Sequence, residues 1–359
     1  MKIGILTYHK SHNYGALLQA IATRHILQGY GHEVSFVDYW PKYRNDGYAL
    51  FSFKKLFSYH SLKPAINYLL KTIRFYGIRK TRKNKFQSFI SKFIQPYCTS
   101  TEDSYDLLIY GSDQIWAKKS ELKDYDAVYF AKNNIKTNRH VAFSASMGIL
   151  PNNAIDIEKT CSLFSNFESL SVREEDLLHF LKTHGFQNAK LTLDPTLLIP
   201  RGTWEDIFDI PATCQKPYVL VYALNGNFDH NEVNAFAEKN GLEVKYILGE
   251  AKQIGKATVI ATADPLDFLR LVKNASIILS SSFHGLAFSL IFKKEFFVSF
   301  ESNAMRAKTL LKAAGLSERF ITPYSQIPES YTPINYNEVF DNLSPLINES
   351  KSFLKSNSF

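Results

Sequence analysis

Short apolar runs and a longer helical pattern alternate at the start of the chain. Residues 3–7 and 33–37 are apolar runs typical of buried strands, and residues 15–28 between them carry apolar positions at helical spacing. Residues 8–14 form a polar loop, and residues 29–32 read as a turn. The order of strand, helix and strand predicts a β-α-β opening and hence a parallel sheet.

The same alternation continues along the rest of the chain. We expect further strands at residues 106–110, 141–144, 169–172 and 190–193, with helices at about 156–164 and 174–183. Residues 200–217 are rich in proline and polar residues and show few periodic signals. A second unit follows, with strands at 218–223, 243–248, 276–279 and 296–300, helices at 230–240, 265–273 and 304–314, and a helical tail at about 337–354.

These patterns predict an α/β fold with two Rossmann-like domains that face a cleft. A chain of 359 residues is long for a single hydrophobic core, which favours two domains of ordinary size. We expect an N-terminal domain at residues 1–200, a C-terminal domain at 201–335 and the helical tail at 336–359. A site for two substrates would form where the strand ends of both domains meet.

The net charge of +8 is concentrated in one segment. Residues 47–101 contain eleven Lys or Arg and no Asp or Glu, which leaves the rest of the chain with a net charge of −3. Aromatic and aliphatic residues alternate with these charges, as in a basic amphipathic surface helix. Three interpretations fit: a solvated helical insertion that packs on its own domain, peripheral contact with an anionic membrane, and nucleic-acid binding. No recognised nucleic-acid motif accompanies the charge, so we expect no nucleic acid as a partner.

The segment around His284 offers the first candidate for chemistry. A predicted strand at 276–279 is followed by three serines, Phe283, His284 and Gly285. Open α/β sheets bind ligands beyond the carboxyl ends of their strands, where helix N-termini and polar loops converge. His284 is therefore a candidate site residue, although a core or capping histidine is the alternative.

Other strand ends carry polar side chains that suit a sugar. Asn13 precedes the first predicted helix, and Asp113, Gln114 and Trp116 follow the strand at 106–110. A carboxylate, an amide and an indole can bind a sugar by hydrogen bonds and stacking. The alternatives are a helix-capping role for Asn13, a turn-capping role for Asp113 and a core position for Trp116.

Basic side chains follow two more strands. Arg173 comes at the end of the strand at 169–172, where a guanidinium could bind a carboxylate or a phosphate, or form an ion pair with Glu174 or Glu175. Arg306 and Lys308 begin the helix at 304–314 and would add positive charge to the same cleft, unless they form a solvated basic face.

Several common classes of site are absent from the sequence. Neither Gly-x-Gly-x-x-Gly, nor the phosphate-loop motif, nor His-Glu-x-x-His occurs. Cys98, Cys161 and Cys214 lie far apart, which argues against a disulfide framework or a zinc site. We expect no metal and no cofactor. No signal-peptide core and no spanning apolar run occurs, so we expect a cytoplasmic protein.

Together these stretches resemble the polysaccharide pyruvyl transferase family over most of the chain. The matching stretches are Asn13-Tyr14-Gly15-Ala16 with Gln19, Gly111-Ser112-Asp113-Gln114-Ile115-Trp116, Ser171-Val172-Arg173-Glu174, Leu193-Asp194-Pro195-Thr196 and Ser282-Phe283-His284-Gly285. The resemblance implies a glycosyltransferase-B-like architecture, with the acceptor on the N-terminal side and the donor on the C-terminal side.

The resemblance also implies a reaction and its residues. The family transfers the enolpyruvyl carbons of phosphoenolpyruvate to two hydroxyls of one sugar, giving a cyclic pyruvate ketal and phosphate. His284 would be the general acid or base, because an imidazole both gives and accepts protons near neutral pH. The other implied residues are Asp113 beside His284 in catalysis, Arg173, Arg306, Lys308, Ser282 and Gly285 for the donor, and Asn13, Tyr14, Gln114 and Trp116 for the acceptor.

One position departs from the family pattern. Many members carry an arginine two residues before the histidine, whereas this chain has Ser282. Either Arg173 and Arg306 bind the anion here, or the donor differs.

The acceptor implied by the resemblance is a surface polysaccharide unit or its lipid-linked precursor, which would give the basic segment a role at the inner face of the membrane. Two alternatives are a nucleotide-sugar glycosyltransferase that binds its nucleotide near Asn225-Gly226-Asn227 and Ser280 to Ser282, and a carbohydrate-binding relative without catalysis.

Overall fold

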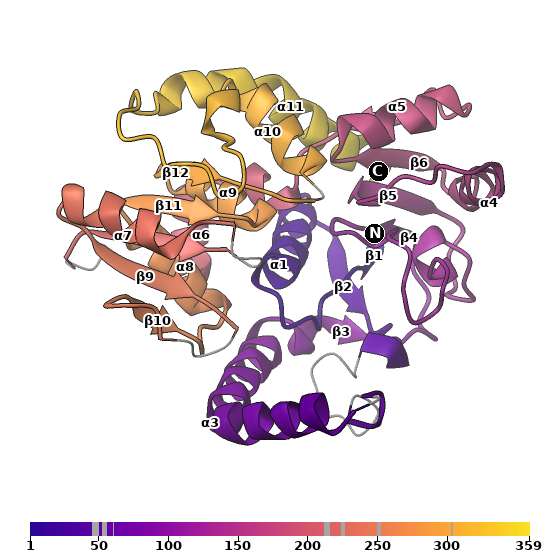
Figure 1. Cartoon of the computed structure of the whole chain (residues 1–359). Helices are drawn as coiled ribbons and strands as arrows, with labels where there is room; N and C mark the ends of the chain where they lie inside the picture. The colour runs from indigo at the N-terminus through magenta and orange to yellow at the C-terminus, as the bar shows by residue number, and fades with distance from the viewer. Residues whose placement is uncertain are drawn as a thin grey trace.

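The computed structural model describes residues 1–44, 50–51, 56–59, 61–211, 216–223, 227–249, 253–302 and 304–359. Within these residues the strands form two parallel sheets, one from each half of the chain (Figure 1). The predicted residues Cys214, Asn225 and Gly226 and parts of the segment 47–101 lie outside the described residues.

The first sheet has seven strands within the described residues, in the order β3-β2-β1-β4-β5-β6-β7. Its strands are β1 (Lys2–Leu6), β2 (Glu33–Val37), β3 (Cys98–Thr99), β4 (Leu107–Tyr110), β5 (His140–Ala145), β6 (Ser169–Val172) and β7 (Lys190–Leu191). All neighbours are parallel, and Ile3 of β1 lies opposite Val34 on one side and Leu107 on the other. Alternate residues along each strand point to opposite faces, so the apolar runs supply a core on both sides of the sheet.

Two separate groups of helices cover this sheet. The helices of the first half are α1 (Tyr14–Gly29), α3 (Leu62–Phe93), α4 (Ala154–Phe164) and α5 (Glu175–Thr183). Leu17 of α1 packs with Ile3 and Ile109 on one face. Phe164 of α4 and Leu181 of α5 belong to the core on the other face. The helix α3 extends away from the body at the bottom of the view (Figure 1).

The second sheet has five strands within the described residues, in the order β10-β9-β8-β11-β12. Its strands are β8 (Tyr218–Tyr222), β9 (Glu243–Ile247), β10 (Thr258–Ile260), β11 (Ile277–Ser280) and β12 (Glu295–Val298). The helices of this half are α6 (Arg201–Phe208), α7 (His230–Lys239), α8 (Pro265–Asn274), α9 (Phe283–Ile291), α10 (Met305–Ala314) and α11 (Tyr336–Asn357).

One continuous core joins the two units. It contains Leu17 of α1, Phe268 of α8 and Leu286 of α9, together with inward-facing residues of both sheets. Tyr14 stacks on Phe268 with ring centroids 5.0 Å apart, and its hydroxyl donates to the carbonyl of Ala263 at 3.1 Å. The helix α11 returns to the first sheet, where the hydroxyl of Ser350 accepts the backbone N–H of Leu193 at 2.8 Å.

The α/β class and the arrangement of two parallel, doubly wound sheets confirm the fold predicted from the sequence. Most predicted strands and helices occur within a few residues of their expected bounds. The helix α6 was not predicted, and neither were the short strands β3 and β10. Among the described residues, none of the helices combines the length and the apolar content needed to span a membrane.

Candidate active site

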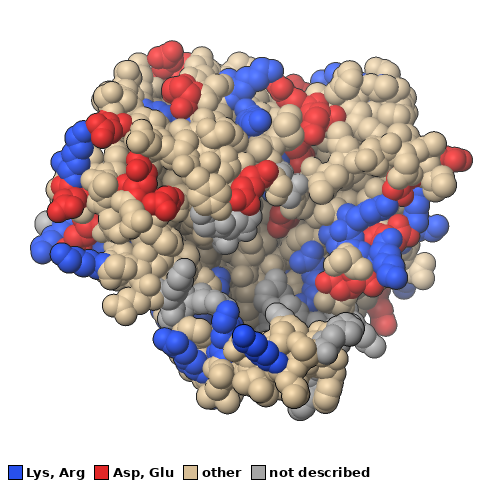
Figure 2. All heavy atoms as spheres, viewed as in Figure 1, with Lys and Arg blue, Asp and Glu red and all other residues tan. Residues whose placement is uncertain are grey.

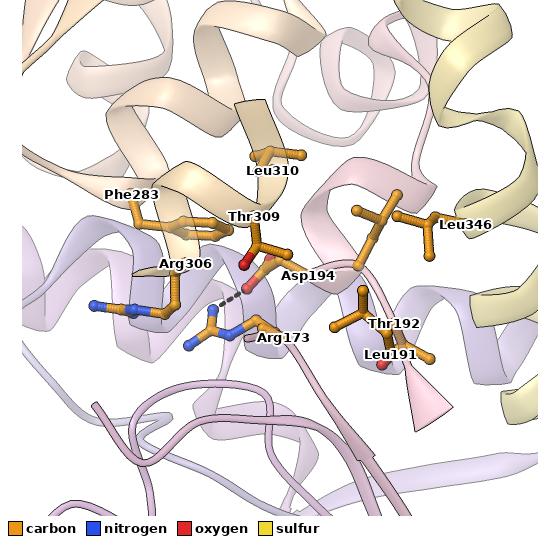
Figure 3. A pocket seen from close by; sticks show the side chains of 10 residues that line it. Arg173, Leu191, Thr192, Asp194, Phe283, Arg306, Thr309, Leu310 and Leu346 are labelled. Atoms are coloured by element: carbon orange, nitrogen blue, oxygen red, sulfur yellow. Dashed lines mark hydrogen bonds and ion pairs between the residues drawn. The ribbon is translucent and has the colours of Figure 1, made fainter. Parts of the chain in front are cut away.

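Charged side chains from both halves of the chain converge between the two sheets. Arg173 directly follows β6, Asp194 lies shortly after β7, and Asp113 lies shortly after β4. His284 and Arg306 are the second residues of α9 and α10. Figure 3 shows the guanidinium of Arg173 joined to Asp194, with Arg306 beside this pair. The structure therefore brings together five of the predicted and matching residues at the carboxyl ends of the strands, where open α/β sheets bind ligands.

Asp194 is the centre of this group and is fully buried. Its carboxylate forms an ion pair with Arg173 and accepts hydrogen bonds from the hydroxyls of Ser112 at 2.9 Å and Thr196 at 2.7 Å. His284 Nε2 lies 3.5 Å from the same carboxylate. Burial alone would raise the pKa of Asp194, but its contacts with His284, Arg173 and Thr196 outweigh this effect and hold that pKa well below its ordinary value.

The predicted alternative for Arg173, an ion pair with Glu174 or Glu175, is wrong. Asp194 takes that place, and Glu175 binds Lys312 at 3.0 Å instead. The guanidinium of Arg173 also lies 3.8 Å from Asp113 Oδ1. Arg173 is thus fixed by carboxylates that follow two different strands.

Arg173 and Arg306 lie beside the same aromatic ring. Their guanidinium carbons are 5.1 and 5.5 Å from the ring centroid of Phe283. Burial, together with the charge of Arg173, lowers the pKa of Arg306 to about 10. Two neighbouring cations that are largely shielded from solvent repel each other, so an anion bound between them would relieve the repulsion.

Buried polar atoms without hydrogen-bond partners gather at this point of the described structure. They are Nε and Nη2 of Arg173, Nε of Arg306, Nε2 of His284 and Oε2 of Glu174. A buried donor without an acceptor is costly, and few such groups occur in folded proteins. Three guanidinium nitrogens in this state indicate a binding place for a ligand with several anionic oxygens.

Glu174 adds a buried carboxyl group to the cluster. It accepts a hydrogen bond from the hydroxyl of Ser146, and its Oε1 lies 3.9 Å from Arg306 Nε. Burial raises the pKa of Glu174, although the charges of Arg173 and Arg306 oppose the shift. A carboxyl group with a raised pKa can exchange protons closer to neutrality than an exposed one.

A small cavity and a larger hollow adjoin the cluster. The cavity has a volume of about 10 Å³, enough for one water molecule, and is lined by Arg173, Asp194, Phe283, Arg306 and Thr309 together with leucine side chains (Figure 3). The hollow, of about 300 Å³, is lined by residues of the loops after β4 and β5, among them Gln114, Tyr125, Met147 and Asn152. The backbone N–H of Ser146 donates to the carbonyl of Asp113 at 3.2 Å, which joins these loops to the cluster.

Three residues predicted for donor binding have structural tasks. Ser282 caps α9 and accepts the backbone N–H of Gly285 at 3.5 Å. Gly285 is buried, and a β-carbon there would lie 2.1 Å from Ser280 Oγ, so close packing explains the glycine. Lys308 is exposed and lies 5.1 Å from the ring centroid of Phe320. The structure does not bring Lys308 into the cluster.

The predicted acceptor residues divide into two groups. Asn13 is exposed and caps α1 by accepting the N–H of Ala16 at 3.1 Å, while Gln114 borders the hollow. Tyr14 and Trp116 are buried. The indole of Trp116 packs on Phe130 and Phe164, and its Nε1 donates to the carbonyl of Tyr129 at 2.9 Å. The predicted sugar-stacking role of Trp116 is therefore wrong, and Tyr14 joins the two units rather than lining an acceptor site.

Asp194 and Glu174 are the functional candidates that the sequence analysis did not assign a role. Both lie in stretches that match the family pattern, and Glu174 was also an alternative partner for Arg173, but neither was assigned a task at the site. Their position directly after predicted parallel strands was the available signal. Asn227, near the predicted nucleotide site, is buried and donates to the carbonyl of Ser299 at 2.8 Å. Within the described part of the chain, no three His, Cys, Asp or Glu side chains are grouped so that they could hold a metal ion.

Comparisons with known proteins give one family and several distant structures. The family model for polysaccharide pyruvyl transferase matches residues 13–299, a range that includes Asp113, Arg173, Asp194 and His284 but ends before Arg306. No curated protein matches the sequence.

Among solved structures, the chain is similar to UDP-GlcNAc 2-epimerases from Neisseria meningitidis and Methanocaldococcus jannaschii. Each is 12% identical with a TM-score of 0.46, covering 99% and 98% of this chain and 94% of each of theirs. The spinosyn rhamnosyltransferase SpnG is 11% identical with a TM-score of 0.39, covering all of this chain and 95% of its own.

Proposed function

Because the chain belongs to the polysaccharide pyruvyl transferase family, we propose that it transfers pyruvyl groups from phosphoenolpyruvate to a saccharide. Two hydroxyls of one sugar residue receive the enolpyruvyl carbons, which form a cyclic ketal while inorganic phosphate is released. The observation that carries the proposal is the set of buried, unpaired guanidinium nitrogens of Arg173 and Arg306 beside the imidazole of His284.

Phosphoenolpyruvate suits this set of side chains because it carries a carboxylate and a phosphate. Arg173 and Arg306 come from opposite units and lie on the same ring of Phe283, so they can bind two anionic groups of one small molecule. Many family members carry an arginine at the position of Ser282, which in this chain caps a helix. Arg306 of α10 is proposed to supply the second guanidinium in its place.

His284 is the proposed general acid. A proton given to the methylene carbon of the donor makes C2 cationic, and a sugar hydroxyl adds there and loses its own proton. The bond from C2 to the phosphate oxygen then breaks, and the second hydroxyl closes the ring with loss of its proton. Asp194 is proposed to orient the imidazole through its contact with Nε2.

The acceptor side is assigned to the loops after β4 and β5. Gln114 borders the hollow of about 300 Å³, and Asp113, its neighbour in the chain, lies 3.8 Å from Arg173. Asp113 is proposed to orient the diol, because its carboxylate can accept hydrogen bonds from two neighbouring hydroxyls. Asn13 is exposed near the same strand ends and is the second candidate for this task.

A thermal-shift panel tests donor binding without an acceptor. Phosphoenolpyruvate at about 100 times its dissociation constant should stabilise the protein by roughly 2.7 kcal/mol. Arg306→Ala should remove most of this gain, whereas Arg201→Ala, which removes an exposed arginine paired with Glu205, should keep it. Stabilisation by nucleotide sugars alone would replace the proposal with glycosyl transfer, and binding without turnover would favour an inactive relative.

Turnover then tests His284. Phosphate release from phosphoenolpyruvate in the presence of an accepted saccharide should fall by about 10²- to 10⁴-fold in His284→Gln, with donor-dependent stabilisation retained. A folded His284→Gln protein with full activity would contradict the assignment.

A further inference from the structure

The helix α3 presents an exposed apolar stripe to solvent. Leu62, Ile66, Leu70 and Ile73 are between 51% and 80% exposed, and Tyr76 is 47% exposed. Residues three and four positions apart lie on one face of a helix, so these five side chains form a single stripe along its first half. Apolar stripes of this length on a surface helix indicate a partner.

Positive charge surrounds the stripe. The sequence of α3 contains nine Lys or Arg and no Asp or Glu. Lys63, Lys71 and Arg74 are exposed on the same half of the helix as the stripe, and Lys80 is exposed just beyond it. Figure 2 shows Lys and Arg side chains over α3 at the bottom of the view.

The second half of α3 fixes the helix to the body. Phe86 and Phe89 are buried, and Phe89 contacts Phe208 of α6 with ring centroids 5.7 Å apart. Lys85 forms an ion pair with Asp267 of α8 at 2.8 Å. The exposed first half is thus held by a packed second half, so the stripe has a defined place on the molecule.

We propose that the first half of α3 docks on an anionic lipid bilayer, with its apolar stripe at the level of the headgroups and its lysines and arginines on the lipid phosphates. An amphipathic helix with a basic surface and bulky apolar side chains binds membranes in this manner. Long basic side chains can lie along the apolar region while their charged ends reach the phosphates.

The charge and the stripe together favour lipid over two other partners. A second copy of α3 would bring nine positive charges against nine, which opposes self-association. Nucleic acid would satisfy the charges but offers no apolar surface to cover Leu70 and Ile73. The inference stands apart from the proposed chemistry, because vesicle binding needs neither donor nor acceptor.

Co-sedimentation of the full chain with vesicles tests the inference. Wild-type protein should bind phosphatidylglycerol-containing vesicles at low salt and much less to pure phosphatidylcholine vesicles. The triple variant Lys63→Glu, Lys71→Glu, Arg74→Glu should lose on the order of 100-fold in partitioning, since each basic residue at an anionic surface contributes roughly five-fold. The double variant Leu70→Ser, Ile73→Ser should lose about tenfold or more.

The matched control reverses three exposed lysines elsewhere, in Lys123→Glu, Lys132→Glu, Lys136→Glu. This control changes the net charge by the same amount as the α3 variant, so it should bind vesicles within a few-fold of wild type if the position of the charges matters. Equal loss in both triple variants, no vesicle binding by wild type at low salt, or α3-dependent binding to duplex DNA without vesicle binding would each overturn it. The inference would also be overturned if wild type failed to bind vesicles but formed a dimer in sedimentation velocity that the Leu70→Ser, Ile73→Ser variant abolished.

Discussion

Gly15 lies directly against the imidazole of His284. A β-carbon at position 15 would fall 1.9 Å from His284 Nδ1, far inside the closest approach of two nonbonded atoms. Gly15 belongs to the first turn of α1 in the first unit, whereas His284 belongs to the first turn of α9 in the second. The position of the proposed general acid is therefore set by close contact between the two units and depends on the absence of a side chain at Gly15.

Replacing Gly15 by alanine should displace His284. The added methyl group meets an aromatic ring that is itself held near Asp194, so overpacking should cost about 1–3 kcal/mol of the free energy of unfolding. Gly29→Ala is the matched control, because Gly29 ends the same helix and a β-carbon there meets nothing within 4 Å. Alanine at position 29 should leave the stability equal or raise it by a few tenths of a kcal/mol.

Urea unfolding of both variants and phosphate release with donor and acceptor are the measurements. Gly15→Ala should lower the turnover rate more than it lowers donor-dependent stabilisation. Equal stability of the two alanine variants would show that His284 has room to move.

The elements of the fold were predictable because their signals are local. Alternate residues of β8 pack on opposite faces, with Leu220 in the core shared with α1 and Val221 in the core under α7. Such double burial requires the continuous apolar run that identifies the strand in the sequence. The helix α6 was missed because it has only eight residues and begins after Pro200, so its buried Trp204 and Phe208 form a single helical repeat.

The site was predictable only in part, because its geometry depends on contacts distant in the sequence. Positions after strands identified Arg173 and His284, but nothing local says that both meet Asp194. At Trp116 the local pattern suggested a role in sugar binding that the structure does not support. A tryptophan after a strand suits either a sugar or a core, and the choice was made by the distant side chains of Phe130 and Phe164.

Asp194→Asn should destabilise the protein strongly at neutral pH. The substitution leaves the buried guanidinium of Arg173 without its closest counter-charge, which typically costs about 3–5 kcal/mol. Asp156→Asn is the control, because it removes a partly exposed surface carboxylate paired with Lys118 and should cost about 1 kcal/mol or less.

The difference in free energy of unfolding between wild type and Asp194→Asn should depend on pH, because the pKa of Asp194 is depressed in the folded protein. The stabilisation is fully present above the ordinary carboxyl value of 3.8 and is lost as pH falls below it toward the lower folded value. The gap between wild type and Asp194→Asn in urea unfolding should therefore be constant from pH 5 to pH 7 and narrow only in stronger acid. A stability difference that narrows already at pH 6 would contradict the depressed pKa of Asp194.

Lys119 is a buried lysine that should make stability rise with pH. Its ammonium group donates to the hydroxyl of Tyr8 at 2.7 Å, and burial together with the charge of Arg44 lowers its pKa from 10.5 to about 8. Between these values the unfolded chain binds a proton that the folded protein lacks, so the free energy of unfolding increases with pH, by up to about 3 kcal/mol. Burial raises the pKa of Tyr8 well above its ordinary value, so its hydroxyl stays neutral in this window.

The measurement is urea unfolding of wild type and Lys119→Met from pH 7 to pH 10. The stability of wild type relative to Lys119→Met should improve steadily above pH 8. Lys118→Met, at an exposed neighbouring lysine, should show no comparable trend below pH 10. Parallel curves for wild type and Lys119→Met would show that the ammonium group is not penalised in the folded protein.

Glu174 should modulate binding of the anionic donor through its charge. Its carboxyl group is buried 3.9 Å from Arg306 Nε, and its pKa is raised, so it loses its negative charge at a higher pH than an exposed glutamate. A carboxylate in this place repels the donor, and its protonation removes the repulsion. Donor-dependent thermal stabilisation of wild type should therefore grow as pH falls toward the raised pKa. Glu174→Gln is nearly the same shape and cannot ionise, so it should bind the donor more tightly than wild type at pH 8, and this difference should shrink as the pH falls and Glu174 of wild type becomes protonated. Comparing wild type with Glu174→Gln at each pH cancels the effect of the donor's own titration.

The control is Glu175→Gln, which removes an exposed carboxylate bound to Lys312. This variant should follow wild type at every pH. If Glu174→Gln and Glu175→Gln behave alike, Glu174 does not sense the donor, and the anion would have to bind away from Arg306.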